Sequence, residues 1–395
     1  AKNQKRGRPA AASDLQALLQ EGLRAHQAGQ LPDAEAAYRR VLGLDADHAD
    51  ANHLLGVIAH QIGDHGAAVE LIGKAIRHDP STAAYHCNLG NALHELDRLD
   101  EAAASQRQAI ALNPDYAKAH NNLANVLLAQ GRSIDAVASY RKALSIVPDD
   151  AETHANLGIA LHELDRLDEA EASYRKALAL DPDYARAHTS LGTTLQETGR
   201  LDDAVASHQQ ALALNPDYAE AHASLGNALK EMDRLEDAVA SYRKAIALDP
   251  DLAGAHTNLG LALQDQGRLE DAAASHRRAI ALNPDYVDAH YNLGNIFQEL
   301  GRMDEAFTCH RRAIALDPQN DLFWAGLAAI LETFSFTSID DNLLQDLSHL
   351  LERPTVRPSY VTRPIISALR HQPDFSQILE LIDSGIRSLE LPTRT

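Results

Sequence analysis

Histidine is the residue type in this sequence with the most evident capacity for chemistry. Seven histidines recur at intervals of 34 residues: His86, His120, His154, His188, His222, His256 and His290. Zinc needs its ligands about 2 Å from one centre, whereas one ring per repeat places neighbouring rings roughly 10 Å or more apart, given the diameter of a helix. The spacing therefore argues against a metal site. We expect the rings to pack half-buried between helices, where protonation below about pH 6.5 would loosen the packing.

Other patterns associated with catalysis are incomplete. His94-Glu95 and His162-Glu163 resemble the start of a zincin helix, but neither is followed by the second histidine of HExxH. The sequence contains no GxxxxGK[ST] loop, no GxGxxG after a strand and no GxSxG elbow. Cys87 and Cys309 lie too far apart for a CxxC pair, which favours a reducing, cytoplasmic location. We expect no enzymatic activity, no catalytic or metal-binding residue and no cofactor.

The elements that carry these residues form an internal repeat. Proline recurs every 34 residues, at Pro80, Pro114, Pro148, Pro182, Pro216, Pro250, Pro284 and Pro318. If Ala83 is position one of its repeat, position eight is small throughout: Gly56, Gly90, Ala124, Gly158, Gly192, Gly226, Gly260 and Gly294. Alanine fills position twenty from Ala102 to Ala306, and Gly22, Ala34 and Tyr38 extend the frame backward. This periodicity predicts about nine repeats.

The pattern within each repeat predicts two antiparallel helices. In the unit 185–218, one apolar stretch at helical spacing ends near Thr198, where Gly199-Arg200 interrupts it, and a second runs from about Asp202 to Leu214. The interrupting position is glycine or aspartate in successive repeats, two residues that tolerate a left-handed backbone. Small residues at positions eight and twenty would let the two helices approach closely. The row of arginines that follows each interruption, from Arg98 to Arg302, is expected to pair with adjacent acids.

With NLG triplets near the start of most units and Ala, Ala and Pro downstream, the sequence resembles the tetratricopeptide-repeat (TPR) family over about three quarters of its length. The recurrent asparagine most resembles the arrays of O-linked N-acetylglucosamine transferases. One departure is the histidine at position four, where the family has a bulky aromatic residue. The resemblance implies an all-α fold, a right-handed superhelical solenoid of about nine helix-turn-helix repeats with a C-terminal helical cap.

Asparagine recurs on one face of the first helix of each repeat. Positions two, six, nine and thirteen share a helix face, which stacked repeats join into an inner wall. We call the asparagines at positions six and nine the amide ladder: Asn88, Asn91, Asn122, Asn125, Asn156, Asn227, Asn258, Asn292 and Asn295. An amide can pair with the backbone of an extended peptide without reading its side chains, a use that the family resemblance also implies. The alternative is that these exposed amides bond only to neighbouring repeats or water.

Acidic residues at position thirteen, including Glu163, Glu197 and Glu231, would line the same face. With 56 acidic against 36 basic residues, the chain should repel nucleic acid and prefer a basic or neutral extended client. The basic segment Lys2–Pro9 contains an Arg-Gly-Arg-Pro core that resembles a minor-groove binder, which the acidic body argues against. No apolar run of about 18 residues supports a membrane span.

The expected organisation is a basic disordered tail at 1–14, nine repeats at 15–320, and capping and connector helices at 321–395. Phe323, Trp324, Leu327 and Leu331 imitate one more first helix. The favoured function is a scaffold that binds an extended polypeptide segment. The alternative is the substrate-recognition region of a larger glycosyltransferase or methyltransferase, which an open reading frame that stops near Thr395 would rule out. A homodimer through the terminal helices is a third hypothesis.

Overall fold

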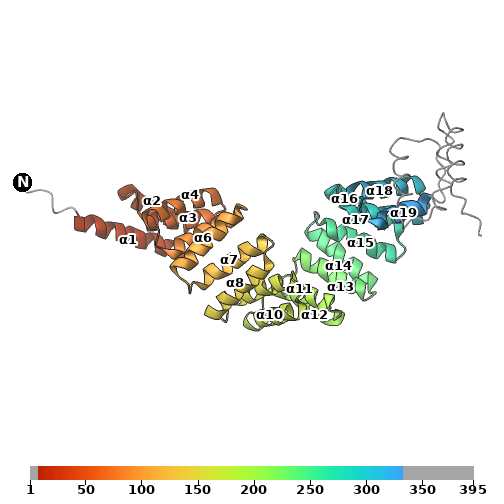
Figure 1. Cartoon of the computed structure of the whole chain (residues 1–395), viewed down its shortest axis with the longest axis horizontal. Helices are drawn as coiled ribbons and strands as arrows, with labels where there is room; N and C mark the ends of the chain where they lie inside the picture. The colour runs from red at the N-terminus through yellow and green to blue at the C-terminus, as the bar shows by residue number, and fades with distance from the viewer. Residues whose placement is uncertain (1–7, 332–395) are drawn as a thin grey trace, which may run out of the picture. The chain divides into compact units, whose positions relative to one another are not determined.

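The computed structural model describes residues 8–331, all of whose regular elements are α-helices (Figure 1). The chain divides into two compact units between Leu214 and Asn215. The first holds α1 (Arg8–Gln27), α2 (Leu31–Leu44), α3 (Ala49–Gln61), α4 (His65–His78), α5 (Ala83–Glu95), α6 (Leu99–Leu112), α7 (Ala117–Ala129), α8 (Ser133–Ile146), α9 (Ala151–His162), α10 (Leu167–Leu180), α11 (Ala185–Glu197) and α12 (Leu201–Leu214). The second holds α13 (Ala219–Glu231), α14 (Leu235–Leu248), α15 (Ala253–Asp265), α16 (Leu269–Leu282), α17 (Val287–Glu299), α18 (Met303–Leu316) and α19 (Asp321–Leu331).

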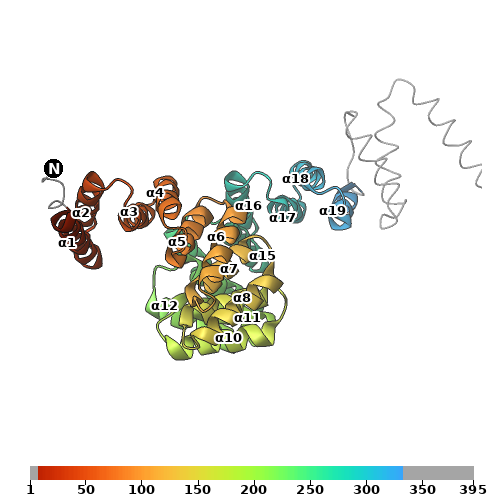
Figure 2. The same ribbon diagram turned by 60° about the vertical axis from the view of Figure 1, so that its left-hand side comes forward.

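Within each unit the helices pair as expected. An odd-numbered helix packs against the even-numbered helix that follows it, and successive odd-numbered helices such as α5 and α7, or α15 and α17, also touch (Figure 2). The all-α array of about nine helix-turn-helix repeats is confirmed. Right-handed superhelical coiling of the whole array stays a prediction.

The turn inside each pair is built by a residue with a left-handed backbone. Gly29, Gly63, Gly131, Gly199, Gly267 and Gly301 have φ between 71° and 86°, and Asp97, Asp165 and Asp233 have φ between 56° and 59°. The next residue donates its backbone N–H to a carbonyl five residues back, as Arg200 does to Leu195 at 2.8 Å. This is a Schellman motif, which ends the first helix and satisfies its last carbonyls. The expected role of the alternating glycine and aspartate is confirmed.

The turn between pairs is closed by the residue at position four. The ring Nε2 of each of the seven periodic histidines lies 2.9–3.1 Å from the carbonyl oxygen of the proline six residues earlier. Asn52 contacts Ala46 O in the same way at 3.2 Å, and Trp324 contacts Pro318 O at 2.9 Å. A carbonyl only accepts, so each ring donates from Nε2–H. Histidine at position four therefore supplies the same kind of N–H donor to this carbonyl as Trp324 does.

Glycine at position eight makes room for the side chain at position twenty-four of the facing helix. A Cβ placed on Gly158 would lie 2.5 Å from the Tyr174 ring, and one on Gly192 would lie 2.6 Å from the His208 ring. Both rings are buried. Alanine at position twenty is likewise fully buried, as Ala170 and Ala204 are. The predicted packing role of the small residues is confirmed.

The first helix begins earlier than expected. Residues 8–14, assigned from the sequence to a disordered tail, belong to α1 in the structure. The physical reason is local, because Pro9 is compatible with a first helical turn and the run Ala10-Ala11-Ala12 has the highest helix propensity. Residues 1–7, which include most of the basic segment, lie outside the described residues.

The last described helix, α19, repeats the pattern of a first helix. Phe323, Trp324, Leu327 and Leu331 are buried and form a cluster with Ala313 and Ile314 of α18. The expectation for these four residues is confirmed. The helices expected at 339–351, 360–369 and 376–389 lie outside the described residues. Among the helices of 8–331, none is long and apolar enough to cross a bilayer.

Candidate peptide-binding face

In the first unit, hydrogen bonds join ladder asparagines of successive repeats in separate pairs. Asn122 Nδ2 on α7 donates to Asn91 Oδ1 on α5 at 2.8 Å, and to Cys87 Sγ at 3.4 Å. The same Asn91 oxygen accepts a second bond from Gln106 Nε2 on α6, at 2.9 Å. Gln106 is fully buried, and its Nε2 also donates to Cys87 O at 2.9 Å. Asn91 thus joins its own repeat to the next one.

The same arrangement recurs twice with tyrosine in place of Gln106. Asn125 Oδ1 accepts from the Tyr140 hydroxyl and, at 3.4 Å, from Asn156 Nδ2. In the second unit, Asn227 Oδ1 accepts from the Tyr242 hydroxyl at 2.8 Å and from Asn258 Nδ2 at 2.9 Å. Both tyrosines are fully buried, and burial raises the pKa of each hydroxyl well above its usual value. The hydroxyls therefore remain protonated donors.

These bonds leave one atom of each ladder amide unengaged. Within the described part of the chain, Nδ2 of Asn91, Asn125 and Asn227 has no acceptor, and Oδ1 of Asn122, Asn156 and Asn258 has no donor. None of these atoms is among the buried polar atoms that lack a partner, so they reach solvent. Each junction between repeats therefore offers one unengaged NH₂ group as donor and one carbonyl oxygen as acceptor.

The remaining ladder residues are held differently. Asn88 Nδ2 lies 2.8 Å from His53 Nε2, and burial lowers the pKa of His53 to about 4, so the ring is a neutral acceptor. Asn292 and Asn295 form no hydrogen bond to other described residues. Their neighbours explain this, because position nine of the preceding repeat is Leu261 and position six of the following one is Gly326.

The expectation that the ladder amides are exposed needs correction. They are half-buried, and Asn156 is only 9% exposed. Bonds between repeats, the alternative use of these amides, do exist for Asn88, Asn91, Asn122, Asn125, Asn156, Asn227 and Asn258. The ladder is therefore part of the stacking interface as well as a surface.

The acidic residues at position thirteen are exposed but engaged. Glu163 accepts from the Ser133 hydroxyl at 2.7 Å, and Glu197 lies 3.0 Å from His162 Nε2 of the preceding repeat. Glu231 is exposed at the end of α13. The arginine row pairs as predicted, each guanidinium meeting the acid three residues later, as in Arg166–Glu169. Such exposed pairs add little stability.

Sequence reasoning missed the buried side chains at position twenty-four. Gln106, Tyr140 and Tyr242 sit below the ladder and orient it, yet in the sequence they look like ordinary members of the second helix. The sequence offers only a weak signal, because asparagine at position nine also stands opposite His310. Asparagine stands there opposite these three residues, whereas Ile159 stands opposite Tyr174 and Leu261 opposite His276.

Comparison with known families agrees with the fold. Family models described as TPR repeat and tetratricopeptide repeat match residues 19–77, 90–131, 115–183, 173–206, 194–233, 226–267, 263–301 and 287–320. The chain belongs to the tetratricopeptide-repeat family. None of the curated proteins compared with it matches significantly.

Several solved TPR structures are similar over part of the chain. MamA is 27% identical, covering 41% of this chain and 95% of its own, with a TM-score of 0.38. YrrB, titled a TPR protein with an unusual peptide-binding site, is 23% identical over 48% of this chain and 97% of its own, with a TM-score of 0.40. PilF of Pseudomonas aeruginosa is 23% identical over 52% and 94%, with a TM-score of 0.48.

Proposed function

We propose that this TPR protein is a scaffold that holds an extended polypeptide segment along its amide ladder. The observation that carries the proposal is the set of unengaged amide atoms at the junctions between first helices, two junctions in the first unit and one in the second, each with a donor group and an acceptor. A peptide backbone carries the complementary pair, one N–H donor and one C=O acceptor per residue. Repeat proteins commonly use such stacked faces for binding.

The energy of binding would come from repetition. One hydrogen bond contributes on the order of 1 kcal/mol net, and micromolar affinity requires about 8 kcal/mol. Several ladder contacts must therefore engage together, along with side-chain contacts. The acidic residues at position thirteen and the excess of 56 acidic over 36 basic residues favour a client that carries lysine or arginine.

Replacing Asn122, Asn156 and Asn258 with alanine tests the proposal. Each substitution removes one exposed carbonyl acceptor, so the triple variant should bind a fluorescein-labelled Ser-Lys-Ala repeat peptide about a hundredfold more weakly than the wild type. Fluorescence anisotropy measures this affinity. Each substitution also removes a bond between repeats, so a lower melting temperature is expected.

A matched triple variant controls for that loss. Asn113, Asn215 and Asn283 lie in the turns between pairs, away from the ladder, and each accepts one backbone hydrogen bond. Alanine at these three positions should lower the melting temperature while leaving peptide affinity unchanged. Equal affinity of wild type and ladder variant for the peptide would refute the proposed function.

The alternative function, a recognition region that presents substrates to a glycosyltransferase or methyltransferase, would use the same face. It stays a hypothesis, as do the narrower likeness to O-linked N-acetylglucosamine transferases and a reducing, cytoplasmic location. Cys87 is buried, and burial raises the pKa of the Cys309 thiol to about 11, so neither thiol is a reactive nucleophile.

A further inference from the structure

The three complete ladder junctions share one arrangement of donors. At each, two N–H or O–H groups converge on Oδ1 of the position-nine asparagine: one from the buried residue at position twenty-four, and one from the position-six asparagine of the next repeat. An amide oxygen has two lone pairs, so both can be accommodated. The convergence decides which way each amide group points.

The buried residue is the fixed part of this arrangement. Tyr140 and Tyr242 are fully buried, and their hydroxyls have the ladder oxygen as partner. Gln106 is also fully buried, and its Nε2 is held by Cys87 O, which can only accept. If Asn91 turned its Nδ2 inward, it would face that N–H group. The oxygen must therefore point inward, because leaving a buried donor unpaired costs more than rotating a half-exposed amide.

We infer that the position-twenty-four residues Gln106, Tyr140 and Tyr242 set the polarity of the amide ladder, so that it recognises the main chain of a proline-poor extended segment. The inference rests on the proposed function. Position nine presents N–H, which suits a client carbonyl, and position six of the next repeat presents a carbonyl oxygen, which needs a client N–H. Proline has no backbone N–H, so a proline at a contacted residue leaves that acceptor unpaired.

In some repeats the position-twenty-four residue has no position-nine asparagine to hydrogen-bond. Tyr174 is buried like Tyr140, but position nine of its repeat is Ile159, so it has no ladder amide to orient. Tyr174→Phe is therefore a control of equal chemistry and similar burial. It should lower stability as Tyr140→Phe does while leaving peptide affinity unchanged.

The orientation can be measured without any client. In protein selectively labelled with ¹⁵N-asparagine, the side-chain NH₂ of Asn125 should exchange with water faster than that of Asn156, because only the latter is hydrogen-bonded. Asn125→Ala and Asn156→Ala identify the two signals. In the Tyr140→Phe variant the Asn125 amide should sample both orientations. Its NH₂ should then exchange with water more slowly, or its signal should split in two. A protected Asn125 NH₂ in wild type, or one that Tyr140→Phe leaves unchanged, overturns the inference.

Binding then tests its consequence. Tyr140→Phe should weaken binding of the Ser-Lys-Ala probe about fivefold to tenfold, and should cause no further loss when added to Asn125→Ala. Loss of equal size in both backgrounds would mean that Tyr140 acts through general stability, which overturns the inference. A probe with proline in place of each alanine should bind more weakly than the original, and equal affinity also contradicts it. Failure of wild type to bind either probe counts against the proposed function, while the exchange measurement still decides the orientation.

Discussion

At the scale of single residues, the histidines fall into two populations. The seven at position four donate from Nε2–H to a proline carbonyl. That donor is present in both the neutral and the protonated ring, so acid leaves this bond itself intact. Burial nevertheless lowers the pKa of His222, and the loosening in acid expected from the sequence stays a prediction. His208, His276 and His310 at position twenty-four are fully buried, and both ring nitrogens of each have no hydrogen-bond partner among the described residues.

Stability should therefore depend on the second population in acid. Burial lowers the pKa of His208, His276 and His310 from 6.5 to about 4. Between these values the unfolded chain binds more protons than the folded one, so stability is intact above about pH 6.5 and falls as the pH drops toward 4. Each ring contributes on the order of 1 to 3 kcal/mol. Denaturant unfolding at pH 7.5 and pH 4.5 measures the difference.

Replacing His208, His276 and His310 with tyrosine provides a comparison without buried histidine. Tyrosine fits position twenty-four, which it occupies in other repeats as Tyr38, Tyr140, Tyr174 and Tyr242. The triple His→Tyr variant should lose much of the pH dependence between 4 and 6.5. A wild type equally stable at both pH values would contradict the assignment.

At the scale of the helix pair, the turns decide where each element ends. Glycine is required at the turn by a backbone with positive φ, whereas glycines inside helices have no such role. α15 carries one of each kind nearby. Gly267 follows its end with φ of 73°, and Gly254 lies in its first turn, where an added Cβ would meet nothing within 4 Å.

The same substitution should therefore have opposite effects at the two sites. Gly267→Ala places a side chain in the left-handed region and should destabilise the protein by about 1 kcal/mol. Gly254→Ala reduces the entropy of the unfolded chain at a helical position and should stabilise it by about 0.5 kcal/mol. Denaturant unfolding of both variants measures the two changes, and a shift of the same sign in both would refute the explanation.

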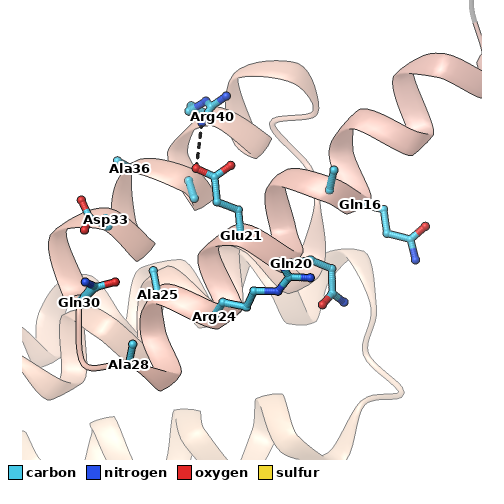
Figure 3. A pocket seen from close by; sticks show the side chains of 12 residues that line it. Gln16, Gln20, Glu21, Arg24, Ala25, Ala28, Gln30, Asp33, Ala36 and Arg40 are labelled. Atoms are coloured by element: carbon cyan, nitrogen blue, oxygen red, sulfur yellow. Dashed lines mark hydrogen bonds and ion pairs between the residues drawn. The ribbon is translucent and has the colours of Figure 1, made fainter.

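At the scale of the whole molecule, the N-terminal end of the array is polar. At position seven, from Leu55 onward, every repeat has leucine, but the first has Glu21, and at position ten it has Arg24. Figure 3 shows Glu21 and Arg24 in the hollow lined by α1 and α2, where Arg40 lies 3.4 Å from Glu21. This surface, which in other repeats is covered by the preceding pair, is suited to water instead.

Removing that polarity should create an end that self-associates. The variant Glu21→Leu with Arg24→Ala restores the apolar residues of inner repeats and should make the protein associate, by pairing of two such faces. Light scattering over a range of concentrations measures the mass. A wild type already dimeric through this face, or a variant that stays monomeric, would contradict the role assigned to Glu21 and Arg24.

The secondary structure of each repeat could be predicted from the sequence alone. Proline every 34 residues, small residues at position eight, and glycine or aspartate at the turns define two helices per repeat, because each signal acts through backbone geometry within a few residues. The same reasoning predicted that the asparagines share one face of the first helices. It failed at residues 8–14, where helix propensity extends α1 into the expected tail.

Only the tertiary structure could show how the amides are used. Asn122 and Asn91 stand 31 residues apart, and Gln106 lies between them on another helix, so their shared hydrogen bonds exist only once three helices pack together. That packing half-buries the ladder amides. It also turns each position-nine oxygen inward, toward the buried donors at position twenty-four. The sequence determined which residues share a face, and the contacts between helices decided which of their atoms remain available.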